Sequence, residues 1–191
     1  MPETILPVVL AGRSLDSLAL ALADRTLPPV DRWHPDHCGD SEMVIHRDGR
    51  WSYRGEPIGR DAMVRLFSTV LRREPDGSHV LVTPAERLTI AVESTAFRAI
   101  AMTSEGVGEA RRIALEIDHA DALIVGPDHP LTVIDTPAGP SPRVRVRGGL
   151  EAELSRSLYY ELADVALAEG HDPAGVWSDG RFFALAPGGS A

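Results

Sequence analysis

Turn-forming residues interrupt this sequence so often that long regular elements are not expected. The 191 residues include 17 Gly and 15 Pro. Asp-Gly dipeptides, which favour the positive backbone φ of tight turns, stand at residues 48–49, 76–77 and 179–180. We therefore expect many short strands joined by tight turns, with a small number of helices between them.

Segments with alternating side chains flank the first of these turns. Residues 43–47 and 50–54 lie on either side of Asp48-Gly49. Trp51 and Tyr53 fall on one face of the second segment, so that face can be buried while the other meets solvent. The pattern predicts a β-hairpin with one buried side.

The middle of the chain, residues 80–134, is predicted to consist of short strands throughout. Gly, Asp, His and Pro residues separate its apolar segments at short intervals. Residues 88–93 and 96–103 stand on either side of Ser94-Thr95, which we interpret as a hairpin connection. Several short strands at this spacing predict a strongly bent antiparallel sheet.

Three segments show the apolar spacing of a helix. The first is residues 15–23, with Ser14 as its N-cap. The second is residues 60–73, and the third is residues 150–169. Each has a stripe of apolar side chains at intervals of three and four residues, which predicts a helix that packs one face against a sheet.

The two halves of the chain show a similar order of elements. In each half a strand ends in Arg-Gly, at residues 54–55 and 147–148, and a helix, a turn and a further strand follow. This order indicates an internal duplication of a strand–helix–strand unit. The alternative is that strand–helix–strand is simply a common motif.

The fold class that follows from these patterns is α+β, with bent antiparallel sheet and one packed helix in each half of the chain. We expect an N-terminal helix and linker at residues 1–28. The first subdomain, a hairpin, a helix and a strand, is expected at residues 29–84. The second, strand-rich subdomain, with a C-terminal helix and hairpin, is expected at residues 85–191.

Charge and composition narrow the classes of function. Asp plus Glu outnumber Lys plus Arg by 28 to 19, which gives a net charge of −9 at pH 7. A chain this acidic repels nucleic-acid phosphates and anionic membranes, so neither is expected as a partner. The apolar segment at residues 15–23 is far shorter than a membrane span. The single cysteine, Cys38, cannot form an internal disulfide, which is typical of a soluble cytoplasmic protein.

Three sets of segments carry a resemblance to a known family. They are residues 33–40 with 48–60, residues 63–67 with 81–84, and residues 146–152 with 175–178. Through them the chain, from about Pro29 to Leu185, resembles a bacterial family of uncharacterised proteins, the domain-of-unknown-function family 1285. The resemblance implies an α+β fold of two roll-like subdomains and a role in ligand sensing or signal transduction. It implies no catalytic residues.

An arginine strip is the first candidate for ligand binding. Arg143, Arg145 and Arg147 alternate with two valines, so the three guanidinium groups share one face of a strand. Forked guanidinium donors bind carboxylate or phosphate groups. The alternative is a solvated face whose charges pair with some of the 28 acidic residues.

Aromatic side chains and one further arginine complete the predicted ligand site. Tyr159 and Tyr160 on the last helix, and Trp177 on the hairpin after it, have the polar-tipped aromatic character typical of ligand clefts. Arg60 stands at a helix N-terminus, where the helix dipole disfavours a cation, so it is expected to bind Glu86 or an anion. We expect a small ligand or a partner protein to bind at the junction of the two subdomains, without a cofactor.

Three alternatives stay open. His34, His37, Cys38 and Asp40 are zinc-ligand residue types, but their spacing matches no zinc pattern, so a metal site is the alternative to a structural loop. A hydrolase-type enzyme would use the His34–Asp40 region or His129, although the chain contains no recognised catalytic motif. A scaffold protein would pair with a partner chain through an exposed strand edge.

Overall fold

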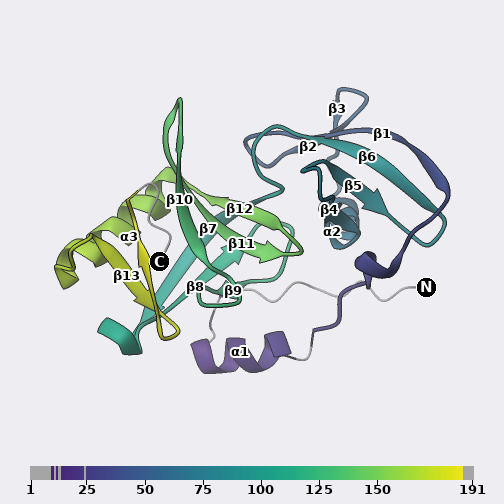
Figure 1. Ribbon diagram of the computed structural model, residues 1–191. Coiled ribbons are helices and arrows are strands. Elements are labelled where there is room, and N and C mark those ends of the chain that lie inside the picture. The colour runs from purple at the N-terminus through teal and green to yellow at the C-terminus, as the bar shows by residue number, and fades with distance from the viewer. Residues whose placement is uncertain (1–9, 11, 13, 24, 187–191) are drawn as a thin grey trace.

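The computed structural model describes residues 10, 12, 14–23 and 25–186. Two six-stranded sheets lie beside each other and form its framework (Figure 1). Residues 1–9 of the predicted N-terminal segment and residues 187–191 of the predicted second subdomain lie outside the described residues. The layered arrangement of helices against sheets is that of an α+β fold, as expected.

The first sheet and helix α2 form the first subdomain. The sheet contains β1 (His37–Ile45), β2 (Trp51–Tyr53), β3 (Glu56–Pro57), β4 (Leu71–Arg73), β5 (His79–Val82) and β6 (Glu86–Val92). Helix α2 (Asp61–Thr69) connects β3 to β4. Its Val64 side chain is buried in the same cluster as Trp51 and Leu81, so the helix covers the inner face of this sheet.

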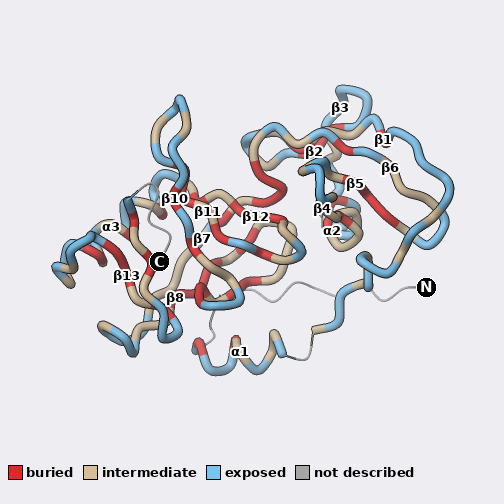
Figure 2. Tube along the Cα trace, viewed as in Figure 1, coloured by how far each residue is buried: buried red, intermediate tan, exposed pale blue. Residues whose placement is uncertain are grey.

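The second sheet, helix α3 and a separate hairpin form the second subdomain. The sheet contains β7 (Phe97–Glu105), β8 (Arg112–Ile117), β9 (Leu123–Ile124), β10 (Leu131–Thr136), β11 (Gly139–Arg147) and β12 (Leu150–Leu154). Helix α3 (Arg156–Glu169) buries Leu158 and Leu162 in the core. The predicted hairpin around Asp179-Gly180 is confirmed as β13 (Gly175–Ser178) and β14 (Arg181–Ala184). Figure 2 shows the buried residues concentrated on the strands and on one side of each helix.

The two sheets have the same strand order, which reveals the internal duplication. Numbered from one to six along the chain, the strands of each sheet follow the order 3-2-1-6-5-4. Each sheet is therefore two antiparallel three-stranded meanders joined at its centre by a parallel pair, β1 with β6 and β7 with β12. The sheets are thus mixed rather than wholly antiparallel. A parallel pair cannot be closed by a tight turn, so turn signals in the sequence do not indicate it.

The repeat predicted from the sequence pairs the wrong segments. It matched residues 50–83 with residues 143–185, but α2 connects the third and fourth strands of its sheet, whereas α3 follows the sixth strand of the other. The Arg-Gly positions look alike because both form tight turns between antiparallel strands. Arg54, Gly55, Gly148 and Gly149 all have positive φ there. The duplicated unit is the six-stranded sheet without its helix.

The border between the subdomains lies further along the chain than residue 84. Strand β6 pairs with β1 and β5 in the first sheet, whereas β7 pairs with β8 and β12 in the second. Ser94-Thr95 is therefore not a hairpin connection, because the strands on either side belong to different sheets. The sequence misleads here because two strands and a short polar link have the same pattern whether or not the strands pair.

Two predicted helices extend too far. The helix predicted at residues 60–73 ends at Thr69, and Leu71 begins β4, where it is fully buried and pairs with Leu81. The helix predicted at residues 150–169 starts only at Arg156, because Leu150–Leu154 alternate between buried and half-buried positions as strand β12. The Ser155 hydroxyl then accepts a hydrogen bond from the Leu158 amide and caps α3.

The N-terminal segment, by which we mean the chain before β1, contacts both subdomains. Helix α1 (Leu15–Ala23) buries Leu15 and Leu18 against Ala114 and Ala122 of the second subdomain. The Ser14 hydroxyl accepts a hydrogen bond from the Ser17 amide, so the predicted N-cap is confirmed. The short 3-10 helix η1 (Val30–Arg32) lies against β4 of the first subdomain. Among the described residues, every helix is too short or too polar to span a bilayer.

Arg147 connects the two subdomains at their centre. Its guanidinium donates a hydrogen bond to the Ser68 carbonyl, at the C-terminal end of α2, and lies 5.3 Å from the centre of the Phe97 ring. A cation at a helix C-terminus is favoured by the helix dipole. The Ser68 hydroxyl donates in turn to the His119 carbonyl, 2.7 Å away in the second subdomain. These contacts fix α2 against the second sheet.

Replacing Arg147 with Ala is expected to lower the free energy of unfolding by about 1.5–3 kcal/mol, because a partly buried, charge-assisted hydrogen bond is lost and the Ser68 carbonyl loses a donor. Urea denaturation at pH 7 measures this. The matched control is Arg145→Ala on the same strand, whose exposed side chain has no partner among the described residues and whose loss is expected to change stability by less than about 0.5 kcal/mol. Equal effects of the two substitutions would contradict this role for Arg147.

Candidate functional site

The predicted arginine strip is not preserved in the structure. Arg145 is exposed, but the pairing of β11 with β12 shifts register between Arg145 and Arg147. Such a bulge changes the direction in which the following side chain points. Arg147 consequently lies half-buried at the subdomain junction, where partial burial lowers the pKa of its guanidinium and nearby Asp121 opposes that effect. Arg143 contacts Glu151 at 3.5 Å, as the solvated-face alternative expects.

The other predicted ligand-binding residues lie apart from one another. Arg60 is exposed at the N-terminal end of α2, and its side chain contacts neither Glu86 nor another charged group among the described residues. The Tyr159 hydroxyl donates to the Leu185 carbonyl at 3.0 Å, so this tyrosine attaches the chain end to α3. Tyr160 is 60% exposed on the same helix. Trp177 packs edge-on against Phe182, with 5.6 Å between the ring centres.

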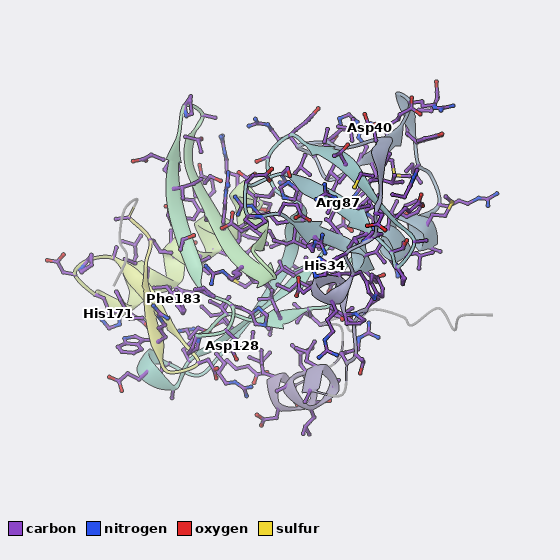
Figure 3. The ribbon with its side chains drawn as sticks, turned by 45° about the vertical axis from the view of Figure 1, so that its right-hand side comes forward. His34, Asp40, Arg87, Asp128, His171 and Phe183 are labelled. Atoms are coloured by element: carbon purple, nitrogen blue, oxygen red, sulfur yellow. The ribbon has the colours of Figure 1, made fainter. Side chains whose placement is uncertain are left out.

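The four candidate metal ligands do not converge. His37–Ile45 is strand β1, so His37 and Cys38 point to opposite faces of the sheet. Asp40 accepts a hydrogen bond from the Glu42 amide at 2.9 Å. Figure 3 shows Asp40 well away from His34. No group of three His, Cys, Asp or Glu side chains within the described ranges is arranged to hold a metal ion.

A cleft at the subdomain junction is lined almost entirely by charged side chains. We call it the junction cleft; it is widely open to solvent, has a volume of about 480 Å³, and its lining comprises His46, Arg47, Asp48, Arg50, Glu93 and Arg98. The first four belong to the turn between β1 and β2, and Glu93 to the connection that leads from β6 into β7. Arg98, on β7, comes from the second subdomain. Both subdomains therefore contribute to this site.

Backbone geometry holds the junction cleft together. The guanidinium of Arg98 donates to the Arg47 carbonyl at 2.7 Å and so connects the second sheet to the β1–β2 turn. Gly49 occupies that turn with a φ of +89°. A Cβ at Gly49 would lie 3.0 Å from Cδ of Arg98, so a larger residue would displace the arginine as well as strain the backbone.

A chain of hydrogen bonds runs along one wall of the cleft. Nδ1 of His46 lies 3.0 Å from Oε1 of Glu93, and Nε2 lies 2.8 Å from Oγ of Ser52. The other Glu93 oxygen accepts the Arg47 amide at 2.9 Å. The Arg47 amide, followed by the His46 ring, lowers the pKa of Glu93. Hydrogen bonds from the backbone and side chain of Arg50 likewise lower the pKa of Asp48, so both carboxylates are charged at pH 7.

The Ser52–His46–Glu93 chain has the connectivity of a nucleophilic triad but the opposite exposure. In a triad the serine must reach substrate while the acid is buried behind the histidine. Here Ser52 is only 4% exposed, whereas the side chains of His46 and Glu93 are 35% and 48% exposed. The arrangement orders the β1–β2 turn rather than presenting a nucleophile.

The histidines named for a hydrolase lie elsewhere. His34 is exposed beside the N-terminal segment, and Nδ1 of His129 lies 3.0 Å from the Arg145 carbonyl. Neither forms an ion pair with a carboxylate among the described residues. A catalytic pair of imidazole and carboxylate is therefore not assembled at either position.

Sequence reasoning missed the junction cleft because its residues are 52 positions apart, from His46 to Arg98. Only the pairing of β1 with β6, and the passage of the chain into β7, bring them together. One local signal was present: three basic residues, His46, Arg47 and Arg50, surround the Asp48-Gly49 turn. Alternation of side chains in a hairpin does not explain such a concentration of charge at its tip.

Fold and site together define a class of protein: two α+β subdomains with duplicated six-stranded sheets and a charged cleft between them. The chain belongs to the DUF1285 family. Its residues 28–95 match the domain of unknown function (DUF1285), N-terminal domain, and residues 96–185 match the protein of unknown function (DUF1285), C-terminal domain. The two matches meet in the connection between β6 and β7, where the sheets change.

Solved structures of the family share this architecture. A DUF1285 family protein from Silicibacter pomeroyi DSS-3 is 38% identical, with a TM-score of 0.79, over 93% of this chain and 97% of that chain. A DUF1285 family protein from Shewanella baltica OS155 is 19% identical, with a TM-score of 0.50, over 64% of this chain and 91% of that chain, which shows the fold alone. Comparison with curated proteins finds no match.

Glu93→Gln is expected to lower the melting temperature at pH 7 and to have little effect at acidic pH. Because the pKa of Glu93 is lowered from its ordinary 4.5, its contribution to stability is complete above 4.5 and is lost as the pH falls through the folded value. Melting temperatures of both proteins between pH 7 and pH 3 measure the difference. Glu161→Gln, an exposed carboxylate without a partner among the described residues, is the control and should show no such trend. A Glu93→Gln effect that is independent of pH would contradict the assignment.

Proposed function

We propose that this protein binds a small, multiply charged anion in the junction cleft and serves in ligand sensing or signal transduction. The observation that carries the proposal is the state of Arg47 and Arg98, which line the cleft from different subdomains. Neither guanidinium forms an ion pair with a carboxylate among the described residues. In a chain of net charge −9, two cations held together without an ion pair to a carboxylate favour an external anion.

The charges of the lining also favour an anion. Three guanidinium groups, those of Arg47, Arg50 and Arg98, oppose two carboxylates, those of Asp48 and Glu93. The net charge of the lining is therefore +1 when His46 is neutral. Asp48 accepts the Arg50 side chain at 2.7 Å, whereas the Arg47 guanidinium donates to no side chain among the described residues and the Arg98 guanidinium donates one hydrogen bond, to the Arg47 carbonyl. A lining without large apolar side chains suits a small polar metabolite better than a hydrophobic one.

The position of the cleft supports a sensing role. Arg98 belongs to the second sheet, and the rest of the lining belongs to the β1–β2 turn and the link between the sheets. An anion that binds Arg47 and Arg98 together would add a contact between the subdomains. Binding of this kind can alter the relative stability of two subdomain arrangements.

Strand pairing with a partner chain is less well supported. The edge strand β3 is two residues long and contains Pro57, and β4 is covered in part by η1. The edge strand β9 is also two residues long, and its Ile124 packs with α1. In the described part of the chain, β10 is the one edge strand of these two sheets that is as long as six residues. No strand is hydrogen-bonded to its outer side. Short or covered edges are those that proteins use to avoid strand addition.

Isothermal titration with inorganic phosphate, pyrophosphate, succinate and citrate tests the proposal. At least one of these anions is expected to bind, and Arg47→Gln is expected to weaken it by about 10-fold or more, since a charge-assisted hydrogen bond contributes about 1.5–3 kcal/mol. The control is Arg156→Gln, an exposed arginine at the start of α3 with no partner among the described residues. No binding of any of the four anions, or equal binding by both variants, would refute the proposal.

A further inference from the structure

A second cleft lies between the N-terminal segment and the outer face of the first sheet. We call it the arm cleft; it is open to solvent, has a volume of about 400 Å³ and is lined by Asp31, His34, Pro35, Cys38, Arg72, Arg73, Glu74, Pro75 and Arg87. Figure 3 shows His34 and Arg87 on the same side of the first subdomain. The lining comes from the N-terminal segment, β1, β4 with the turn after it, and β6. The arm cleft is therefore complete only when the segment is docked on the sheet.

Arg72 and Glu74 form the rigid wall of the arm cleft. Nε of Arg72 donates to Oε1 of Glu74 at 2.7 Å. Nη1 of Arg72 donates to the carbonyls of Val30 and Trp33 at 2.8 and 2.9 Å. This arginine thus holds the N-terminal segment to β4, and its donors are engaged by the protein itself. It has a structural role in the cleft.

Arg87, in contrast to Arg72, has donors that the described residues do not use. Its side chain is 39% exposed, and its ion-pair partner is Glu74, at 3.7 Å, which is too far for a hydrogen bond. Arg87 also lowers the pKa of Asp76 through its charge, without a hydrogen bond. Nothing in residues 25–186 accepts a hydrogen bond from its guanidinium. Arg73 makes one hydrogen bond, to the Gly149 carbonyl at 3.2 Å, and His34 makes none within the described residues. Three basic groups from β6, β4 and the N-terminal segment therefore keep unused donors in one cleft.

We infer that the arm cleft binds a phosphate group, with Arg87 as its main ligand and Arg73 and His34 as further donors. These donors belong to three separate elements rather than to one planar fork. A tetrahedral phosphate presents oxygens in several directions, whereas a carboxylate presents two in one plane. The net charge of the lining is +1 with His34 neutral, because three arginines oppose Asp31 and Glu74.

Binding at this position would hold the N-terminal segment in place. Asp31, His34 and Pro35 of that segment form part of the cleft, so a bound phosphate adds a contact that the undocked segment cannot make. The same segment reaches the second subdomain, where α1 buries Leu15 and Leu18 and Arg25 pairs with Asp121. A phosphate in the arm cleft therefore stabilises the docked N-terminal segment, which contacts both subdomains. It does so independently of the junction cleft.

Limited trypsin digestion tests this inference, since trypsin cleaves after Arg25 and Arg32 when the segment is undocked. If pyrophosphate binds only the docked form, a free concentration ten times its Kd is expected to slow cleavage by about 11-fold. Inorganic phosphate is expected to protect as well at a higher concentration, and succinate is not. Arg87→Gln is expected to abolish the protection, whereas Arg47→Gln in the junction cleft is expected to retain it, which separates this inference from the proposed function.

His34→Ala supplies a second variant, because its side chain is exposed and its replacement is not expected to disturb folding. It is expected to reduce the protection at a given pyrophosphate concentration. The circular dichroism spectrum and melting temperature of each variant establish that it is folded. Protection that is the same in Arg87→Gln and His34→Ala as in the parent protein would overturn the inference. So would equal protection by succinate, or cleavage that pyrophosphate does not slow.

Discussion

The structure depends on a half-buried arginine at the place where the two subdomains meet. Arg147 is held between the C-terminal end of α2 and the Phe97 ring, and burial there lowers its pKa. An arginine in such a position stays charged, so it must find acceptors or cost several kcal/mol. The Ser68 carbonyl supplies one, with the helix dipole behind it. The apolar core is continuous across this point, from Trp51 in the first subdomain to Phe183 in the second, so the subdomains pack as a single unit.

The positions of the charged side chains say more about a possible ligand than the net charge of the chain does. The chain is strongly acidic, yet each cleft contains arginines that form no ion pair or only a long one within the described residues. Arg47 and Arg98 of the junction cleft and Arg73 of the arm cleft form none there, and Arg87 lies 3.7 Å from Glu74. Other arginines have structural roles that their environments explain, as Arg72 does with Glu74 and two backbone carbonyls. The distinction between a structural and an available arginine rests on how many of its donors are already used: the guanidinium groups of Arg98 and Arg73 each donate one hydrogen bond, to a backbone carbonyl, and keep the other donors.

Local patterns in the sequence predicted local structure well. The Asp48-Gly49 and Asp179-Gly180 hairpins form where the turn chemistry places them, and Ser14 caps the first helix. The α+β class, the two subdomains and the family were also accessible from the sequence. The predicted ligand residues were chosen on strand alternation and helix spacing, and the bulge before Arg147 removes the alternation on which the arginine strip depended. His46 and Glu93, which carry the hydrogen-bond chain of the junction cleft, had no signal in local periodicity.

The sequence by itself determined the kinds of element, their approximate order and the positions of the tight turns, because backbone φ preferences and side-chain alternation act over a few residues. Only the tertiary structure decided that β1 lies beside β6 and β7 beside β12, which makes the two sheets equivalent and moves the subdomain border past β6. It also decided which arginines are buried, paired or available. Those outcomes depend on contacts between residues about 50 positions apart, and the free energy of such contacts is set by packing and burial that no short window of sequence contains.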